Sequence, residues 1–211
     1  MKNEILLSTA YLPNIQYISK FLTKQQVFME GCENFTKQTY RNRCNILGAN
    51  KIQQLTIPVH KGISPKQQIR DVKISYSEDW HRVHWKSIVS AYNSTPFFEY
   101  FADDFFSVFQ EKPIFIFDFN LKLLSLVFEI LELDVNFQIT DTYNTELEPN
   151  NFDLRDAIHP KKVFEDSYFK IIPYPQVFEE RFGFQPNLSI IDLIFNVGND
   201  AHLFLQKSIQ Q

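Results

Sequence analysis

Two arginines, Arg41 and Arg43, have the residue type and spacing that most directly indicate binding chemistry. They lie within residues 38–46, whose alternation predicts a β-strand, and side chains two residues apart on a strand project to the same face. Two guanidinium groups on one face can hold a phosphate or a carboxylate, because each presents a planar set of donors. Arg70 could complete this arrangement. The pattern also fits a solvated strand face whose arginines pair with acidic side chains. That is the more ordinary arrangement, and the sequence leaves both interpretations open.

Proton transfer would need a general acid or base, and the two candidates are His84 and Glu33. His84 belongs to a cluster that includes His81 and Trp85, and histidine is a common general base near neutral pH. Glu33 could act together with Glu30 as a pair of carboxylates. Both features also have a structural interpretation. The cluster fits the partly buried face of an amphipathic helix, and the two glutamates would then lie on opposite faces of a strand end.

The end of the first predicted strand, residues 5–10, is a further candidate for a binding site. Ser8 and Tyr11 lie there, just before a helix that Asn14 is expected to cap. Ligands of open α/β sheets bind at the carboxyl ends of the strands. The chain has no glycine-rich phosphate loop, so a phosphate would have to be held by side chains.

The elements that must position these residues follow an α/β pattern. A strand over 5–10, a helix from Asn14 to Lys24 and a strand over 26–30 predict a parallel βαβ unit. Residues 38–46 and 51–59 predict a β-hairpin, and 69–75 a further strand. The fold class expected is therefore α/β, as a single mixed-sheet domain with an N-terminal βαβ unit, a β-hairpin and a largely helical C-terminal half.

The C-terminal half is expected to be mainly helical. Helical periodicity predicts helices from Ser77, over 97–109 and over 113–133, followed by a strand over 135–140. Residues 142–162 are polar and predict a long surface loop. Ser189 and Asp192 fit a capping box that opens a helix, with Gly198 just past its end.

Composition limits the classes of function. The chain has 211 residues, of which 44% are hydrophobic, and we expect one domain spanning residues 1–211. The net charge of −4 and the absence of a basic stripe argue against nucleic-acid binding.

No apolar run is long enough for a membrane span, and no signal-peptide pattern is present, so a cytoplasmic location is expected. Cys32 and Cys44 have no metal-ligand spacing, so no metal site is predicted. The sequence identifies neither a cofactor nor an oligomeric state.

Several blocks of sequence resemble the WbqC-like protein family of bacteria. In chain order, they are YLP at 11–13, ENFTKQTYRNRC at 33–44, LTIPV at 55–59, IRDV at 69–72, WHRVHW at 80–85, SAYNSTPFF at 90–98, FQPNLSIIDL at 184–193 and NVG at 196–198. The chain differs from many relatives at two places. It has Ser8-Thr9-Ala10 where they have His-Gln-Pro, and Gly31-Cys32 where they have paired aspartates. If those residues act in catalysis elsewhere, this chain has lost that activity or uses Glu30, Glu33 and Asn34 instead.

The resemblance implies a role near cell-surface polysaccharide (O-antigen) biosynthesis but carries no mechanism. One hypothesis is a transferase acting on an anionic nucleotide-sugar or amino-sugar. The other is a non-catalytic binding or scaffold protein of the same pathway, so whether the chain is an enzyme stays open. The catalytic candidates are His84 and Glu33, and the candidates for binding an anionic substrate are Arg41, Arg43, Tyr11, Asn34 and Arg70.

Overall fold

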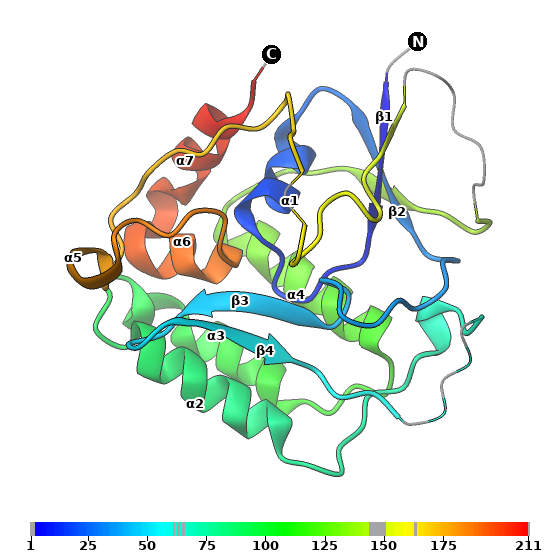
Figure 1. The fold of residues 1–211 in the computed structure, drawn as a ribbon, viewed down its shortest axis with the longest axis horizontal. Helices are drawn as coiled ribbons and strands as arrows, with labels where there is room; N and C mark the ends of the chain where they lie inside the picture. The colour runs from blue at the N-terminus through cyan, green and yellow to red at the C-terminus, as the bar shows by residue number, and fades with distance from the viewer. Residues whose placement is uncertain are drawn as a thin grey trace.

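A computed structural model describes residues 3–60, 62, 64, 66–143, 151–162 and 164–210 of the chain (Figure 1). The strands are β1 (Glu4–Ser8), β2 (Gln26–Glu30), β3 (Arg43–Leu47), β4 (Ile52–Thr56), β5 (Phe137–Ile139) and β6 (Phe152–Asp153). The helices are α1 (Ile15–Ser19), α2 (Trp80–Tyr92), α3 (Phe98–Gln110), α4 (Ile116–Ile130), α5 (Glu179–Phe182), α6 (Ile190–Val197) and α7 (Ala201–Ser208). Short 3-10 helices cover Lys20–Leu22, Ile69–Asp71 and Gly198–Asp200. The predicted α/β class is confirmed, with its N-terminal βαβ unit, its hairpin and its helical C-terminal half.

The strand β1 determines the topology of the parallel sheet, whose order is β5-β2-β1-β6. β2 pairs with one side of β1, from Glu4 opposite Gln26 to Ser8 opposite Glu30, and β5 lies beyond β2. β6 pairs with the other side of β1. The chain therefore builds the sheet in one direction and then returns to the opposite side of its first strand. A reversal of this kind opens a crevice at the carboxyl ends of the strands.

The loop of residues 9–14, termed the β1–α1 loop below, is buried along its whole length. Buried backbone groups need hydrogen-bond partners, and here the partners come from distant segments. The Tyr11 N–H donates to the Tyr40 carbonyl at 2.8 Å, and the Pro13 carbonyl accepts from the Ile190 N–H at 2.7 Å. The loop thus joins the parallel sheet to the segment before the hairpin and to the start of α6.

The helix α1 begins where the sequence predicts. Asn14 caps it, because its Oδ1 accepts from the Tyr17 N–H at 3.0 Å. The helix is shorter than expected: α-helical geometry ends at Ser19, and a 3-10 turn completes the segment to Leu22.

The predicted strand over 38–46 is wrong in its first half, because β3 begins only at Arg43. Gln38 has a φ of +64°, which no extended strand accommodates, and the Thr39 hydroxyl closes a turn onto the Thr36 carbonyl. Arg41 therefore precedes the strand and does not share its face with Arg43. The hairpin itself is confirmed, with Arg43 opposite Thr56, and it forms its own two-stranded sheet.

Two further expectations about secondary structure need correction. Residues 69–75 are not a strand. They begin as a 3-10 helix, and later only Lys73 and Ile74 make isolated bridges. Within the polar segment 142–162, residues 144–150 lie outside the described residues, but Phe152 and Asp153 form β6. A strand of two residues has no periodicity to detect, so no pattern in the sequence predicts it.

Helices α2, α3 and α4 form near their predicted positions, and α6 packs among them. All eight residues of α6 are buried, and α6 contacts α1, α2, α3 and β3. In Figure 1 the hairpin lies between α2 on one side and α1 and α6 on the other. A helix that is buried on every side lies inside a core, and the two polar residues of α6, Asp192 and Asn196, are buried with the rest. Among the described residues, no helix has the length and apolar character needed to cross a membrane.

The predicted capping box of α6 is wrong, although the helix begins at the expected residue. Ser189 makes no side-chain cap; its hydroxyl donates instead to the Leu12 carbonyl of the β1–α1 loop at 2.8 Å. Asp192 is 1% exposed and serves as an internal acceptor, and burial raises the pKa of its carboxyl. Ser189 and Asp192 therefore connect α6 to its neighbours.

We predict that Asp192→Ala lowers the free energy of unfolding by roughly 3 kcal/mol or more, at about 1–3 kcal/mol for each buried donor left unsatisfied. Its carboxylate accepts from the hydroxyls of Tyr92 (2.9 Å) and Tyr174 (2.7 Å) and from Gln176 Nε2 (2.9 Å), and the variant leaves these buried donors unsatisfied. Urea denaturation measures the change. Asp200→Ala is the matched control, because Asp200 is exposed and makes no side-chain cap, and it should change stability by only about 0.5 kcal/mol. Equal losses in the two variants would contradict the role given to Asp192.

Candidate functional site

Polar side chains gather where the parallel strands end. Ser8 ends β1, Glu30 ends β2, Asp153 ends β6, and Thr140 directly follows β5. Because the strands are parallel, these residues meet at one edge of the sheet. Together with Glu33, Arg41 and Arg155 they are termed the carboxyl-edge cluster. It lies at the strand reversal between β1 and β6, where open α/β sheets hold ligands.

Glu33 and Arg41 form a buried, two-pronged ion pair within this cluster. Arg41 Nε donates to Glu33 Oε1 at 2.9 Å, and Arg41 Nη2 donates to Glu33 Oε2 at 2.5 Å. Both residues are 3% exposed. Arg41 Nη2 also donates to Ser8 Oγ at 2.6 Å and lies 3.2 Å from Asp156 Oδ1. The Nε and Nη2 atoms of the Arg41 guanidinium group are therefore engaged by protein acceptors.

Glu30 and Arg155 form the second ion pair of the cluster. Glu30 Oε1 accepts from the Thr140 hydroxyl at 2.5 Å and from the Cys32 N–H at 2.9 Å, while Glu30 Oε2 accepts from Arg155 Nη1 at 3.2 Å. Arg155 Nε also donates to Asp153 Oδ1 at 2.9 Å, and Arg155 Nη2 donates to Asp153 Oδ2 at 2.6 Å. The side chain that ends β2 is thus tied to the side chain that ends β6.

Burial and ion pairing act in opposite directions on these charges. Burial raises the pKa of Glu33, and the contacts with Arg41 and Ser8 limit this rise. Burial opposes the charge of Arg41, but Glu33 and Asp156 outweigh that effect and raise the pKa of Arg41. Burying such a network costs desolvation free energy, so the network is stable only when every charge has a partner. The cavity within it holds only about 10 Å³, so a ligand does not fit there without displacing side chains.

Tyr11 and His84 meet each other but are not bonded to the carboxyl-edge cluster. The Tyr11 oxygen lies 2.9 Å from His84 Nδ1, and both side chains are buried. The Tyr11 hydroxyl and His84 Nδ1 share this hydrogen bond, and the backbone of Thr56 favours the charged form of the ring without offsetting the effect of burial. Burial lowers the pKa of His84 to about 4. His84 is therefore a neutral histidine in the core at neutral pH.

The remaining candidates lie apart from one another. Arg43 Nη1 donates to Gln54 Oε1 on the neighbouring strand at 2.7 Å, and Asn34 is exposed. Arg70 Nη2 donates to the Thr140 carbonyl at 2.9 Å, at the rim of the carboxyl-edge cluster. Of the predicted site residues, the structure therefore brings together Glu33 and Arg41, with Arg70 nearby, and separately Tyr11 and His84. Their functional roles stay predictions.

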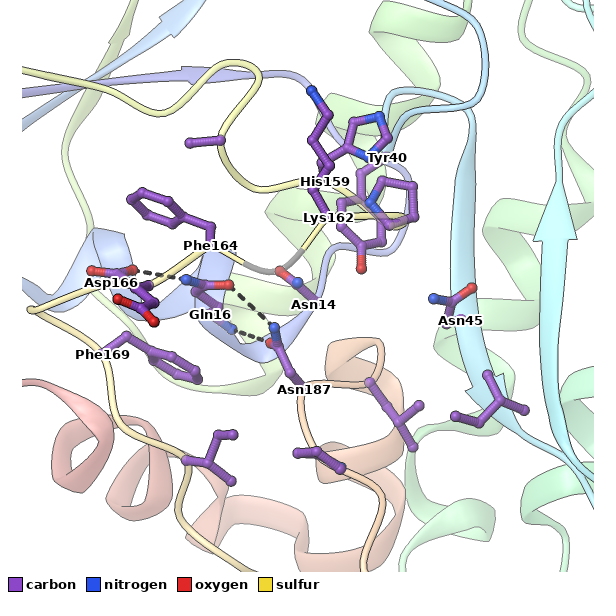
Figure 2. Close-up of a pocket in the computed structure, with 17 residues that line it drawn as sticks. Asn14, Gln16, Tyr40, Asn45, His159, Lys162, Phe164, Asp166, Phe169 and Asn187 are labelled. Carbon is purple, nitrogen blue, oxygen red and sulfur yellow. Dashed lines mark hydrogen bonds between the residues drawn. The ribbon is translucent and has the colours of Figure 1, made fainter.

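A pocket of about 430 Å³ opens beside the carboxyl-edge cluster, and Tyr40 lines both cavities (Figure 2). Its walls come from the start of α1, the hairpin with the preceding Tyr40, residues within 157–162 and 164–171, and the residues before α6. Its polar lining consists of Asn14, Gln16, Tyr40, Asn45, His159, Lys162, Glu165, Asp166 and Asn187, and Phe164 and Phe169 are among its apolar residues. The volume falls within the range of about 300–1,000 Å³ that is usual for small-molecule sites.

Hydrogen bonds fix the side chains at the centre of this pocket. Asn187 Oδ1 accepts from the Gln16 N–H at 2.9 Å, and Asn187 Nδ2 donates to Gln16 Oε1 at 3.2 Å, as Figure 2 shows. Gln16 Nε2 donates to Asp166 Oδ2 at 2.9 Å, and Asp166 also pairs with the buried Lys20. Asn187 holds a φ of +53°, a conformation that asparagine tolerates better than most residues. The amide groups are therefore held in place before any ligand arrives.

His159 supplies a hydrogen-bond donor to the same pocket. Its Nδ1 accepts from the Lys161 N–H at 3.1 Å, so a neutral ring carries its proton on Nε2. Burial, together with the nearby charge of Lys162, lowers the pKa of His159, which keeps the ring neutral at pH 7. Among the described residues, no group of three histidine, cysteine, aspartate or glutamate side chains could hold a metal ion.

Sequence patterns did not find this pocket. From the sequence, Asn14 is expected only to cap a helix, and His159 and Lys162 belong to a segment expected only as a surface loop. The lining comes from four segments that are far apart in the chain. The one usable signal was the placement of Asn14 after the first strand of a βαβ unit.

The fold and site define the class: an α/β protein with a strand reversal and a polar pocket at the carboxyl ends of its parallel strands. Residues 9–162 match the WbqC-like protein family, and the chain belongs to that family. It is similar to the uncharacterised protein Rv1507c of Mycobacterium tuberculosis, with 22% identity over 231 residues that cover 98% of each chain. No solved structure matches the chain.

We predict that Arg41→Ala lowers the free energy of unfolding by about 3–5 kcal/mol, because it leaves the Glu33 carboxylate buried without its partner. The double variant Arg41→Met/Glu33→Gln should regain much of that loss, since it removes both charges. Arg43→Ala is the control two residues away, and it should cost less than about 1 kcal/mol because its bond to Gln54 is exposed. Urea denaturation of the four proteins tests this. A double variant less stable than Arg41→Ala would show that the charges themselves stabilise the fold.

We also predict a pH dependence from His84. The folded pKa of about 4 lies below the unfolded value of about 6.5, so the unfolded chain takes up the proton first as the pH falls. Stability due to this group is therefore full above about pH 6.5 and is lost as the pH falls towards 4, by at most about 3 kcal/mol.

The measurement is the difference in unfolding free energy between the parent protein and His84→Gln at several pH values. Other acidic groups titrate in both proteins, so the difference isolates His84. The parent should lose more stability than the variant between about pH 6.5 and pH 4. Parallel curves would contradict the assignment.

Proposed function

We propose that this protein binds an anionic, hydroxyl-rich small molecule of the nucleotide-sugar or amino-sugar type in the pocket of Figure 2. The observation that carries the proposal is the pocket lining: fixed amide side chains, two aromatic rings and a lysine beside a neutral histidine. The position of the pocket, beside the carboxyl-edge cluster, supports it as well.

The amides of the pocket suit a sugar. Each amide side chain carries donors and an acceptor, as each sugar hydroxyl carries a donor and acceptor sites, so the two can exchange hydrogen bonds in both directions. Asn14, Gln16, Asn45 and Asn187 line the pocket together with the Tyr40 hydroxyl. Aromatic rings provide the apolar surface against which the C–H face of a sugar packs.

The charged residues of the lining suit a ligand with an anion at one end. Figure 2 shows Lys162 and His159 near Tyr40, while Asp166 lies at the opposite end beside Phe169. An ammonium group and an imidazole N–H can hold a phosphate. Asp166 accepts from Gln16 and Lys20, and Glu165 adds a second carboxylate to the lining, which could take the amino group of an amino-sugar.

Binding is the part of the function that the geometry supports best. Neither of the catalytic candidates, Glu33 and His84, lines the pocket, and His84 is held in the core by Tyr11. The finer hypothesis of a transferase in surface-polysaccharide biosynthesis stays a prediction, as do the cytoplasmic location and the single domain over residues 1–211. The transferase hypothesis comes from the family resemblance, and the alternative hypothesis is a non-catalytic binding protein of the same pathway.

We predict that Lys162→Ala weakens ligand binding while Lys161→Ala does not. Uridine diphosphate N-acetylglucosamine and glucosamine phosphate are suitable probes, and the melting temperature is the readout. A ligand at about 100 times its dissociation constant adds roughly 2.7 kcal/mol of stability, and each kcal/mol raises the melting temperature by about 2–4 °C. Lys161 is the matched control, because it is the adjacent lysine and lies outside the pocket lining.

Three outcomes of this experiment would decide the matter. A shift in the parent and in Lys161→Ala that is absent from Lys162→Ala would support the proposal. No shift with any probe, or an equal loss in the two variants, would overturn it. If binding is found, incubation with the bound nucleotide-sugar and an acceptor separates the hypotheses, because a transferase releases the nucleotide and a binding protein does not.

A further inference from the structure

A second cavity, of about 570 Å³, lies between α2 and α3 and shares no lining residue with the pocket of Figure 2. Here it is termed the α2–α3 groove. Its lining consists of His81, Arg82, Trp85, Lys86, Phe106, Phe109, Gln110 and Lys112. The proposed function above makes no use of these residues.

The floor of the α2–α3 groove is aromatic. The Trp85 ring centroid lies 5.2 Å from that of Phe106 and 6.0 Å from that of Phe109. Phe109 is buried, Trp85 is half-buried, and Phe106 is 37% exposed. A flat ring entering the groove would therefore find aromatic surface that the fold itself leaves partly uncovered.

The rim of the groove is cationic. Arg82, Lys86 and Lys112 are all exposed, and the lining contains no carboxylate. Arg82 lies 3.8 Å from Asp79 in an exposed pair, whereas Lys86 and Lys112 have no ion pair with any residue that the structure describes. Arg82 and Lys86 are four residues apart on one helix, a spacing at which like charges repel. This concentration of positive charge stands out in a chain whose net charge is −4.

The usual explanation for cations above aromatic surface is that their aliphatic stems cover it. That explanation does not account for the groove, because a cavity of about 570 Å³ remains between the rim and the floor. The volume lies within the usual range for small-molecule sites.

We infer that the α2–α3 groove binds a nucleoside phosphate, with the base stacked on Trp85 and Phe106 and the phosphates held by Lys86, Lys112 and Arg82. Base stacking on aromatic side chains tolerates any base, and lysine and arginine are the usual phosphate ligands. The inference concerns a second site, so it does not depend on what the pocket of Figure 2 binds.

The two tryptophans make the groove directly observable. Trp80 is 5% exposed, while Trp85 lies in the groove floor, so a base stacked there should quench the emission of Trp85. The probe is adenosine triphosphate. Adenosine tests the ring without the charge, and inorganic tripolyphosphate tests the charge without the ring. We expect saturable quenching by adenosine triphosphate, and binding of each half-ligand at least roughly tenfold weaker, a difference of about 1.4 kcal/mol.

Charge-reversal variants locate the site. Lys86→Glu/Lys112→Glu should weaken the binding of adenosine triphosphate by at least roughly tenfold, and both residues are exposed, so the fold is not at risk. Lys24→Glu/Lys162→Glu is the matched control, because it changes the net charge equally and includes the lysine of the Figure 2 pocket. This control should leave the quenching unchanged. It could abolish sugar binding while nucleotide binding persists, so the two proposals fail separately.

Three results would overturn the inference. One is no quenching at millimolar adenosine triphosphate. Another is equal weakening in the groove variant and the control, which would indicate non-specific charge attraction. The third is tripolyphosphate binding as tightly as adenosine triphosphate.

Discussion

The fold depends on how the buried backbone of the β1–α1 loop obtains its hydrogen bonds. Every residue of this loop is buried, so its N–H and C=O groups need partners within the protein. Tyr40 accepts from the Tyr11 N–H, Ile190 donates to the Pro13 carbonyl, and the Ser189 hydroxyl donates to the Leu12 carbonyl. The same bonds hold the start of α1 and the residues before α6 together, and these are two walls of the pocket in Figure 2. The requirement that organises the core therefore also shapes the proposed binding site.

The carboxyl-edge cluster and the pocket are adjacent but differ in their interactions: the cluster is filled by ion pairs, and the pocket is open. Ion pairs fill the crevice at the strand reversal, where ligands of α/β sheets often sit, and leave no room for a ligand. Asp156 and His159 follow Arg155 within a few residues, so the segment fixed by this cluster continues directly into the pocket wall. The charged network thus lies beside the pocket, whereas amide side chains and Lys162, Glu165 and Asp166 line the open space.

Local sequence patterns predicted the elements that local interactions determine. The apolar runs of β1 and β2, the Asn14 cap and the helical periodicity of α2 to α4 all depend on near neighbours, and the structure bears them out. The site depends on contacts that no periodicity encodes. Arg41 lies next to Glu33 because the chain turns at Gln38. β6, which pairs with β1, lies in a polar segment whose composition predicts a loop. Asp192 resembled a cap and proved to be an internal acceptor, because its three donors come from other segments.

The position of β1 in the middle of the parallel sheet has a consequence for how the chain folds on the ribosome. β2 follows β1 closely in the chain. The other side of β1 pairs only with β6, which begins at Phe152, and the Leu12 carbonyl accepts its hydrogen bond from the hydroxyl of Ser189. During synthesis, one edge of β1 therefore stays unpaired until most of the chain has emerged. Such contacts between distant residues slow folding and expose strand edges that can aggregate.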